Sequence, residues 1–568
     1  MYIIQIENVV KKYELSAGGC VKALDCINLN VRKGEILGII GKSGAGKTTL
    51  LKIVRGIERF DEGTVTVEGI KLTPLSPPEE FYKVKCKTAI HLQRSFGLWS
   101  ETVRDNVIRA LYFHDNGEEM VPSKESSEYE EYSKRAMENL SVVDLAHKAE
   151  FWVGILSGGE KQRLVLARQI AKKPSILLLD EPGTMTCPKS RDDLLNAVKN
   201  TNEKLGVTVV VVSHMPEIHT HICDRVVRIE QGKVVEEGDP REITRKFVSE
   251  MEPIEPKRLL RAKKTIVSMK DVTKEYYSVP GGRISVMKDL NLDVYSGEIL
   301  AIIGPSGAGK TVLLRLISGC EIPDKGEIIF KSMDDAVNMA KLGLPSTKLR
   351  LHLALLHQEF DLPFSATVAE IFARRLGLRF WPYVENAMKR ARKMGIGDEI
   401  FDFLYRVTDL PRKEAVEMVR KLGLEEDMLD YLFPTYPLSK IEKKAVPILK
   451  FLDLPHDTLY RRIYELSKGE QVRIAIGAAF LSKPSVVLLD EPFGDLDPIT
   501  LRKIANAIKE VNKEFKSTFI LVSHQLDFVK EVVHRAALIT NGELICSGNP
   551  KKVCERFLRL IEEGKISF

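Results

Sequence analysis

The chain has 568 residues, which is enough for two or more domains with well-buried cores. Its apolar fraction of 44% and charged fraction of 29% are ordinary for a globular protein. A net charge of +6 over this length is slight, so the composition argues against a general affinity for nucleic acid or for membrane surfaces.

The apolar runs of the chain are strand-sized and fall far short of a membrane span. The first residues, MYIIQIENVVKKY, alternate as a strand does and lack the apolar core and cleavage site of a signal peptide. The 8 cysteines include no C-x-x-C pair, which favours reduced thiols over disulfides or a metal site. We therefore expect a cytoplasmic protein without a membrane span of its own.

The first chemical signature is GKSGAGKT (41–48), which follows the apolar stretch ILGII (36–40). Glycines let the backbone curl so that successive N–H groups face phosphate oxygens, and the following helix adds its positive dipole end. The lysine of such a loop reaches the β- and γ-phosphates, and the next threonine ligates Mg²⁺. The predicted phosphate-site residues are Gly41, Ser43, Gly44, Gly46, Lys47, Thr48 and Thr49.

A second signature, LLLDEP (177–182), places Asp180 and Glu181 at the exposed end of a predicted buried strand. Two adjacent carboxylates there suit one residue oriented toward Mg²⁺ and its neighbour oriented toward an attacking water. Alone, such a pair is usually a solvated turn. Downstream of a phosphate loop, it is predicted to be catalytic.

The second half of the chain repeats this order of motifs. GPSGAGKT (304–311) lies 263 residues after the first loop, and VLLDEP (487–492) lies 310 residues after LLLDEP, so the second copy is longer by 47 residues. Nearly all of this growth falls between Gln358 and Ser467. The second-copy site residues are Gly304, Ser306, Gly307, Gly309, Lys310, Thr311, Asp490 and Glu491.

The repeat predicts two domains of one α/β fold class. In each copy an apolar strand, a glycine-rich turn and a helix precede alternating strands and helices, which is typical of a parallel sheet covered by helices. We predict domain 1 at 1–245, a linker at 246–264, and domain 2 at 265–568. The enlarged helical arm of domain 2 is expected at about 365–462.

Together these motifs resemble those of ATP-binding cassette (ABC) ATPases, over nearly the whole chain except the insertion. The resemblance implies two tandem P-loop nucleotide-binding domains, each with a mostly parallel sheet core, an antiparallel β subdomain and a helical subdomain. It also implies ATP and Mg²⁺ as cofactors. The implied general bases are Glu181 and Glu491, and the implied γ-phosphate contacts are His214 and His524.

The same resemblance implies further contacts for the nucleotide. Tyr13 and Tyr276 are expected to stack on adenine, and LSGGE (156–160) and LSKGE (466–470) are the signature segments that cap a helix toward the γ-phosphate. The signature residues are Ser157, Gly158, Gly159, Ser467 and Gly469. The implied metal ligands are Thr48, Gln93, Asp180, Thr311, Gln358 and Asp490.

In this family two cassettes close face to face, so the resemblance implies an intramolecular pseudo-dimer with two composite sites. Site one would combine Lys47 with the signature of domain 2, and site two would combine Lys310 with that of domain 1. Each site has one irregular component. Lys468 replaces a signature glycine in site one, and Cys187 stands where domain 2 has Asp497.

Lys468 raises a question about backbone conformation. If the glycine conformation at this place had positive φ, lysine would cost about 1 kcal/mol or more. Its ammonium could offset that cost by approaching phosphate, or its side chain could simply point to solvent. Because both glutamates and both histidines remain, we expect hydrolysis in both sites, at rates that need not be equal.

The enlarged arm contains FARRLGLRFWPYVENAMKRARK (372–393), which is basic and rich in aromatic residues. One interpretation is an amphipathic helix pair with solvated charges and its own small core. Another is a docking surface for a protein partner, since aromatic residues and arginine favour interface centres. Nucleic acid ranks third, because the basic bias is local.

Three classes of function compete for such a chain. The first is the ATPase subunit of a membrane transporter with a separately encoded permease, and the second is a twin-cassette translation factor, which would need a longer linker. The third is an ATPase that remodels or activates another enzyme.

The short join, LSKGE and the insertion resemble the component A2 family of the methyl-coenzyme M reductase activation system. That resemblance implies ATP-dependent reductive activation of the reductase, with the reductase or its activation proteins as partner.

Overall fold

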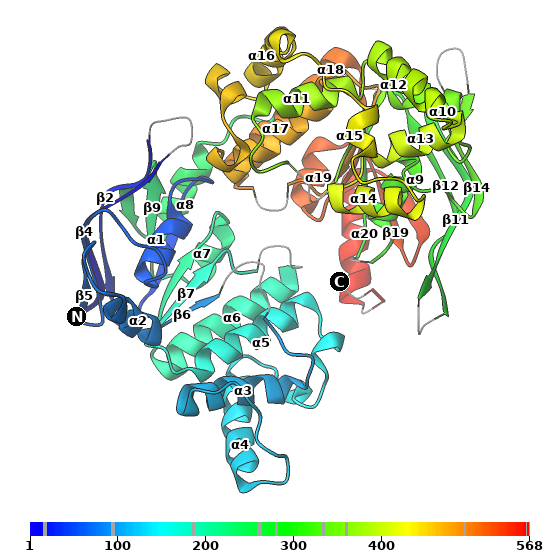
Figure 1. The fold of residues 1–568 in the computed structure, drawn as a ribbon. Helices are drawn as coiled ribbons and strands as arrows, with labels where there is room; N and C mark the ends of the chain where they lie inside the picture. The colour runs from blue at the N-terminus through cyan, green and yellow to red at the C-terminus, as the bar shows by residue number, and fades with distance from the viewer. Residues whose placement is uncertain are drawn as a thin grey trace. The chain divides into compact units, whose positions relative to one another are not determined.

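A computed structural model describes residues 1–14, 20–91, 97–183, 188–257, 264–278, 282–305, 307–331, 336–357, 362–493, 496–563 and 565–566. The chain divides into two compact units (Figure 1). Unit 1 comprises Met1–Met251 with Asp495–Thr500, and unit 2 comprises Glu252–Gly494 with Leu501–Phe568. Across the described ranges, no helix has the length and apolar character that crossing a bilayer requires.

Unit 1 contains a six-stranded sheet in the order β10-β9-β3-β8-β7-β6 and a four-stranded sheet in the order β2-β1-β4-β5. The six-stranded sheet is parallel except for the β9–β10 pair, and the four-stranded sheet is antiparallel. The strands are β1 Tyr2–Glu14, β2 Cys20–Arg32, β3 Ile36–Ile40, β4 Glu62–Val67, β5 Ile70–Leu72, β6 Thr88–His91, β7 Ile176–Asp180, β8 Thr208–Val212, β9 Arg225–Glu230 and β10 Lys233–Gly238.

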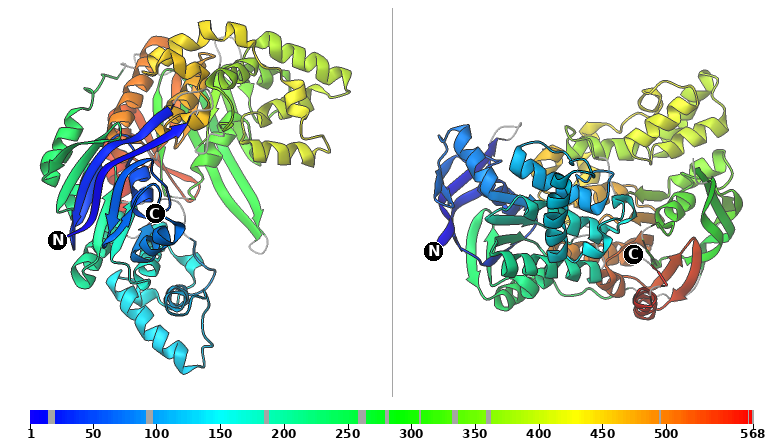
Figure 2. Two further views of the ribbon diagram at one scale, coloured as in Figure 1. Left: turned by 60° about the vertical axis from the view of Figure 1, so that its left-hand side comes forward. Right: turned by 90° about the horizontal axis from the view of Figure 1, so that it is seen from below.

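The helices of unit 1 cover the parallel sheet and extend beyond it. Helix α3 packs on α4 and α5, and α5 packs on α6, so that α3 and α4 form the end of the unit farthest from the antiparallel sheet (Figures 1 and 2). The helices are α1 Lys47–Val54, α2 Pro78–Lys87, α3 Val103–Asn116, α4 Ser127–Val142, η1 Ala146–Lys148, η2 Val153–Ile155, α5 Gly158–Ala171, α6 Pro188–Leu205, α7 Pro216–Ile222 and α8 Pro240–Ser249.

Unit 2 repeats both sheets, in the orders β16-β17-β18-β13-β19-β20 and β12-β11-β14-β15. The central strands β3, β7, β8, β13, β17 and β18 are buried along their whole length, as strands covered by helices on both faces must be. The strands are β11 Thr265–Ser278, β12 Gly282–Tyr295, β13 Ile299–Ile303, β14 Lys325–Lys331, β15 Ala336–Asn338, β16 Leu353–Leu356, β17 Val486–Asp490, β18 Thr518–Val522, β19 Arg535–Thr540 and β20 Glu543–Gly548.

The helical arm of unit 2 is larger than that of unit 1. Helices α12 to α15 gather beside α10 and the antiparallel sheet (Figure 1). The helices of the unit are α9 Lys310–Ser318, α10 Leu344–Arg350, α11 Val368–Gly377, α12 Trp381–Lys393, α13 Asp398–Val407, α14 Arg412–Lys421, α15 Met428–Leu432, η3 Leu438–Lys440, α16 Glu442–Phe451, η4 His456–Tyr460, η5 Ile463–Glu465, α17 Lys468–Phe480, α18 Pro498–Phe515, α19 Leu526–Val532 and α20 Pro550–Glu562.

These elements confirm the predicted α/β fold class, with a mostly parallel sheet, an antiparallel sheet and a helical part in each unit. Within the predicted linker, residues 252–257 lie on unit 2. There Glu255 N donates to Asn506 Oδ1 at 3.1 Å, and Lys257 Nζ donates to Val533 O at 2.7 Å. Residues 258–263 lie outside the described ranges.

A buried ion cluster joins the arm to the body of unit 2. Asp409, which follows α13, accepts hydrogen bonds from Arg350 of α10, Arg375 of α11 and Arg379, and the side chains of Asp409, Arg350 and Arg379 are fully buried. Although burial raises the pKa of Asp409, the three guanidinium groups hold it well below the usual range. The cluster keeps this carboxylate ionised in the interior.

The arm also contacts α9, the helix that follows the second glycine-rich loop. Arg406 of α13 donates to Gly319 O at 3.0 Å, and Arg315 of α9 pairs with Glu414 of α14 at 3.1 Å. Arg350 donates to Ser318 O at the end of α9. The arm is therefore bonded directly to the helix that begins at Lys310.

The basic segment 372–393 forms part of this arm. Its apolar face is buried, including Phe372, Val384 and Met388, and its basic side chains pair largely with carboxylates of the same arm. Phe380 and Tyr383 lie with Tyr436 in a partly exposed aromatic cluster, with ring centroids 5.8 to 6.4 Å apart. The interpretation as a packed helix pair therefore holds for the buried face, and the aromatic cluster remains on the surface.

Candidate active sites

The glycine-rich loop of unit 1 runs from the end of β3 to the start of α1. Gly44 and Gly46 have φ of 81° and 97°, a backbone conformation that glycine adopts without strain. A Cβ at Gly41 would lie 2.3 Å from Ile229 O, so only glycine fits there. Lys47 is buried, and its Nζ donates to Gly41 O at 2.8 Å and to Lys42 O at 3.0 Å. Burial lowers the pKa of Lys47, and the Glu181 carboxylate opposes that shift.

The loop of unit 2 has the same geometry. Gly307 and Gly309 have φ of 77° and 89°, and a Cβ at Gly304 would lie 2.0 Å from Ile539 O. Lys310 Nζ donates to Gly304 O at 3.0 Å and to Pro305 O at 2.8 Å. Both lysines therefore curl back over their loops, where a phosphate would receive the ammonium and the backbone N–H groups together. Ser306 lies outside the described residues.

Asp180 and Asp490 end the buried strands β7 and β17, each separated from the strand of the glycine-rich loop by one strand. The Thr48 hydroxyl donates to Asp180 Oδ1 at 3.2 Å. Burial raises the pKa of Asp180 to about 6, and burial does the same for Asp490. Asp490 Oδ1 is buried without a hydrogen-bond partner among the described residues. This orphaned oxygen and the neighbouring threonine fit a divalent cation that prefers oxygen ligands.

Glu181 and His214 contact each other at the same edge of the sheet in unit 1. His214 Nδ1 lies 2.9 Å from Glu181 Oε1, and the Ser213 hydroxyl donates to Glu181 Oε2 at 3.0 Å. Although burial raises the pKa of Glu181, His214 and Lys47 lower it below the usual range. The carboxylate is thus held in the ionised form that can accept a proton from water.

Unit 2 pairs the equivalent residues differently. His524 Nε2, rather than Nδ1, lies 2.8 Å from Glu491 Oε1, and His524 is more exposed than His214. Glu491 and Glu181 have φ of 49° and 53°, a left-handed conformation uncommon outside glycine. Such strain is concentrated at functional sites, because the surrounding structure must enforce it.

The two tyrosines differ in their surroundings. Burial raises the pKa of Tyr13, and the Thr49 hydroxyl in the first turn of α1 opposes that shift. Lys11 Nζ lies 4.9 Å from the centre of the Tyr13 ring. The Tyr276 hydroxyl donates to Glu321, and Lys274 Nζ lies 5.6 Å from its ring centre. Both rings are partly exposed. Among the described residues, the Tyr13 hydroxyl is therefore directed to the helix that follows the glycine-rich loop, and the Tyr276 hydroxyl is bonded to Glu321.

The two signature segments form the same helix cap. Ser157 and Ser467 each accept a hydrogen bond from the backbone N–H three residues on, and Glu160 and Glu470 each accept one in return. This capping box fixes the first turns of α5 and α17. It leaves the serine at the helix N-terminus, where an anion is favoured.

Lys468 and Gly158 are the first residues of α17 and α5. A right-handed helix has negative φ at this position, and a Cβ at Gly158 would meet no atom within 4 Å. The strain considered for Lys468 therefore does not arise. By contrast, a Cβ at Gly159 would lie 2.5 Å from Ser190 Cβ.

Gly158→Lys is expected to fold with a stability within about 1 kcal/mol of the parent. Lysine has a higher helix propensity than glycine, and this stabilises the helix by roughly as much as a cation at the helix N-terminus destabilises it. Gly159→Ala, the matched change one residue later, is expected to cost about 1–3 kcal/mol because it crowds Ser190. Urea denaturation of both variants tests the comparison. Equal losses in both would contradict the distinction between the two glycines.

The remaining residues of the predicted sites are Gln93, Gln358, Cys187 and Asp497. Gln93, Gln358 and Cys187 lie outside the described residues. Asp497 belongs to the segment grouped with unit 1, where its Oδ2 accepts from Ser43 N at 3.1 Å and from the Thr500 hydroxyl at 2.7 Å. Sequence reasoning missed Ser213 and Thr49 as partners of Glu181 and Tyr13. The recurrence of VSH in both halves was the available signal for Ser213.

Comparison with known proteins agrees with this geometry. A family model described as ABC transporter matches residues 24–184 and 287–494. An uncharacterized ABC transporter ATP-binding protein of Methanocaldococcus jannaschii is 44% identical over 564 residues, which cover 98% of this chain and 97% of that protein. The methionine import ATP-binding protein MetN of Bacillus subtilis is 37% identical over 268 residues, covering 46% of this chain and 75% of MetN.

Among solved structures, the archaeal ribosome recycling factor aABCE1, in a complex with the ribosomal stalk protein aP1, has a similar fold. The TM-score is 0.54 at 20% identity, with 98% of this chain and 92% of that chain covered. Two matched cassettes and a relative similar over its whole length together identify the family. The chain belongs to the ABC transporter ATP-binding family and is an ATPase with two tandem cassettes.

Proposed function

We propose that both cassettes bind Mg²⁺-ATP on their glycine-rich loops and hydrolyse it. Lys47 and Lys310 donate to phosphate oxygens, and Glu181 and Glu491 accept the proton of the attacking water. When bound, Mg²⁺ neutralises phosphate charge, and Thr48 with Asp180, or Thr311 with Asp490, hold it. The orphaned Asp490 Oδ1 and the Glu181–His214 contact support these roles.

The family resemblance further suggests that each ATP is completed by the signature segment of the other cassette. Ser467 and Gly469 then serve the nucleotide held by Lys47, and Ser157, Gly158 and Gly159 serve that held by Lys310. The capping boxes support this assignment, because each leaves its helix N-terminus able to receive the γ-phosphate. Gln93 and Gln358 complete the proposed metal ligands.

We assign the action of the ATPase on its partner to the enlarged arm of unit 2. Its ion cluster and the Arg315–Glu414 pair bond it to α9, the helix that begins at Lys310. The arm also exposes the Phe380–Tyr383–Tyr436 cluster, and aromatic residues favour interface centres. We infer that ATP-driven closure acts on a protein partner docked on the helical arms.

For the identity of the partner, we propose methyl-coenzyme M reductase or its activation proteins. The short join, the LSKGE signature and the insertion in the second arm support this assignment by their resemblance to the component A2 family. The function is then ATP-dependent reductive activation of the reductase. We propose that this activation takes place in the cytoplasm and that nucleic acid takes no part in it.

A second candidate is the ATPase subunit of a membrane transporter with a separately encoded permease. The names of two relatives favour it, since they are an ABC transporter ATP-binding protein and a methionine import ATP-binding protein. In this case the helical arms would dock on the permease. The two candidates predict different partners in the same purification.

Purification of the tagged protein from native lysate with ATP, followed by mass spectrometry, is expected to recover reductase subunits. Phe380→Ser is expected to reduce that recovery at least fivefold, whereas Leu422→Ser, which changes another exposed apolar residue of the arm, is not. Recovery of a polytopic membrane protein in place of the reductase would favour the transporter candidate. Unchanged ATPase activity in both variants would show that folding is intact.

A further inference from the structure

A buried histidine of unit 1 lies behind the Glu181–His214 pair. His219, in α7, is fully buried, and its Nε2 lies 2.9 Å from Ser213 O. On the other side of the ring, Nδ1 lies 3.7 Å from Cys223 Sγ. Because a carbonyl oxygen can only accept a hydrogen bond, the ring proton is on Nε2, and Nδ1 accepts from the thiol. Burial lowers the pKa of His219 to about 4, so the imidazole is neutral at physiological pH.

The neighbouring strand has room for this imidazole only because it carries a glycine. A Cβ at Gly38 of β3 would lie 2.4 Å from His219 Nδ1 and 2.9 Å from Cys223 Sγ. The φ of Gly38 lies outside the left-handed region, so the backbone conformation does not itself require glycine here. Glycine at this position therefore serves to make space for the histidine.

Unit 2 replaces all three residues together. The equivalent positions in β13, in α19 and directly after α19 hold Ala301, Val529 and Val533, which are fully buried. The surrounding strands pair in the same way, since β3 lies between β8 and β9 as β13 lies between β18 and β19. Unit 2 thus builds the same fold with apolar residues, and burying a polar ring costs free energy. Folding alone does not account for His219.

Ser213 connects this histidine to the proposed general base. Its hydroxyl donates to Glu181 Oε2 at 3.0 Å, and His214 N donates to the same oxygen at 3.3 Å. The Ser213 carbonyl that accepts from His219 belongs to the same planar peptide group as this His214 N–H. A hydrogen bond to the carbonyl therefore fixes the direction in which the N–H meets Glu181, and the two bonds polarise each other across the peptide group.

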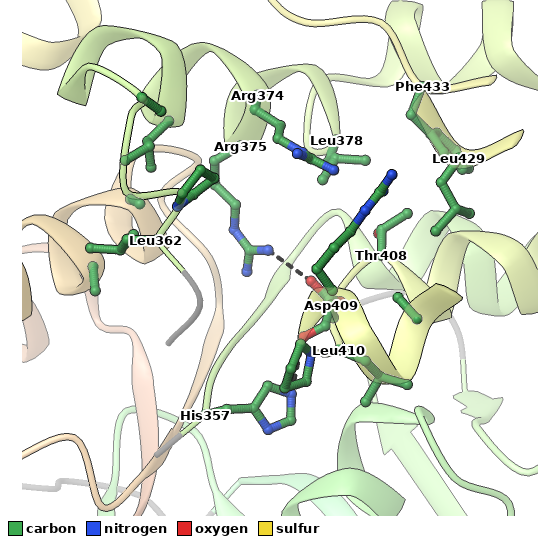
Figure 3. Close-up of a pocket in the computed structure, with 18 of the residues that line it drawn as sticks. His357, Leu362, Arg374, Arg375, Leu378, Thr408, Asp409, Leu410, Leu429 and Phe433 are labelled. Atoms are coloured by element: carbon green, nitrogen blue, oxygen red, sulfur yellow. Dashed lines mark hydrogen bonds and ion pairs between the residues drawn. The ribbon is translucent and has the colours of Figure 1, made fainter. Parts of the chain in front are cut away.

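A second buried histidine that binds a backbone carbonyl lies in unit 2 and has different surroundings. His357 Nε2 lies 3.0 Å from Asp409 O, where both residues line a cavity of about 730 Å³ (Figure 3). Asp409 belongs to the ion cluster that joins the arm to the body of the unit, so the contact of His357 forms part of the packing of the arm. The peptide group that His219 binds leads instead to Glu181.

We infer that His219 is a positioning residue of site one, which holds Glu181, through the Ser213–His214 peptide group, in the orientation that accepts a proton from water. Gly38 makes space for the imidazole, and Cys223 fixes its tautomer. The inference rests on the proposed role of Glu181 as general base. Because unit 2 has valine in place of His219, the arrangement also gives a physical reason for unequal turnover in the two sites.

The test gives unit 1 the residues of unit 2. Gly38→Ala/His219→Val/Cys223→Val is expected to be at least as stable to heat as the parent, because apolar groups replace both partners of a buried polar contact. Its kcat for ATP hydrolysis is expected to fall about three- to tenfold, the effect of losing about one hydrogen bond in the transition state. KM and the affinity for a fluorescent ATP analogue are expected to stay unchanged, because Lys47 and its loop are unaltered.

Two further variants separate positioning from packing. His219→Gln can still donate to Ser213 O from its amide, so its kcat is expected to stay within about twofold of the parent value. Thr201→Val is the matched control, since it removes a buried hydroxyl of α6 that donates to Ala197 O at 2.8 Å. It is expected to keep the parent kcat.

Turnover of site one is isolated in a Glu491→Gln background. If that background is itself inactive, the two sites turn over only together, and the same loss is expected in the parent background. Parent-level kcat in the triple variant, or an equal loss of kcat in His219→Gln, would overturn the inference. A fall in thermal stability that accompanies the fall in kcat would overturn it too. Unchanged turnover on adding Glu181→Gln would contradict the general base itself, so the two failures are distinguishable.

Discussion

Glu181→Gln/Glu491→Gln is expected to lower steady-state ATP hydrolysis by a factor of about 10²–10⁴, the usual contribution of a general base. Glutamine keeps the shape of the side chain but cannot accept the proton of the attacking water. ATP binding is expected to persist, because the glycine-rich loops and Lys47 and Lys310 are unchanged. Turnover measured with a coupled phosphate assay, beside equilibrium binding of a fluorescent ATP analogue, separates the two effects.

The single variants test whether the two sites are equal. Glu181 contacts His214 Nδ1 and the Ser213 hydroxyl, whereas Glu491 contacts His524 Nε2. We expect Glu181→Gln and Glu491→Gln to differ in residual turnover, since their neighbours hold the carboxylate differently. Full turnover in the double variant would contradict the general-base assignment. Ser213→Ala is a milder control that removes one hydrogen bond and keeps the carboxylate.

Asp409→Asn is expected to destabilise unit 2 by about 3–5 kcal/mol, the usual cost of removing one partner of a buried ion pair. The change leaves Arg350, Arg375 and Arg379 without their shared carboxylate, and two of these side chains are fully buried. Hydrogen–deuterium exchange of peptides from 368–421, together with urea denaturation, measures the loss where it occurs. Asp398→Asn, which breaks an exposed pair with Arg392, is expected to cost far less.

The same cluster predicts a direction for the effect of pH. The folded pKa of Asp409 lies below its unfolded value, because the arginines outweigh burial. Its contribution is therefore present above the ordinary carboxylate pKa and is lost as pH falls through the folded value. The parent should lose stability on acidification by more than Asp409→Asn does. Parallel losses in both proteins would contradict the role of the cluster.

The repeated motifs were enough to predict the fold class and the two phosphate loops. GKSGAGKT and GPSGAGKT follow apolar strands, and the structure brings Lys47 and Lys310 back over their loops as the motif requires. The interaction of Tyr13 with Thr49 could not be predicted, because it depends on how β1 lies beside α1. Which ring nitrogen of His214 or His524 faces the neighbouring glutamate likewise depends on packing, and the motif does not determine it.

The arginine cluster shows a similar limit. Arg350, Arg375, Arg379 and Asp409 are scattered over 60 residues without a common period, so the sequence offered only a basic, aromatic segment. That pattern predicted a helix pair with a possible docking surface. It did not indicate that two of its arginines are bound to a buried aspartate. The sequence also did not show that Lys468 is the first residue of α17, where the helical backbone has negative φ and lysine causes no strain.

We propose that ATP turnover in this chain drives the activation of a protein partner. The most direct test mixes purified inactive methyl-coenzyme M reductase, its activation proteins, an electron donor and ATP with this protein, and measures Ni(I) by electron paramagnetic resonance. A Ni(I) signal is expected that requires both ATP and the parent protein and is lost with Glu181→Gln/Glu491→Gln. An equal signal without ATP, or with the double variant, would contradict it.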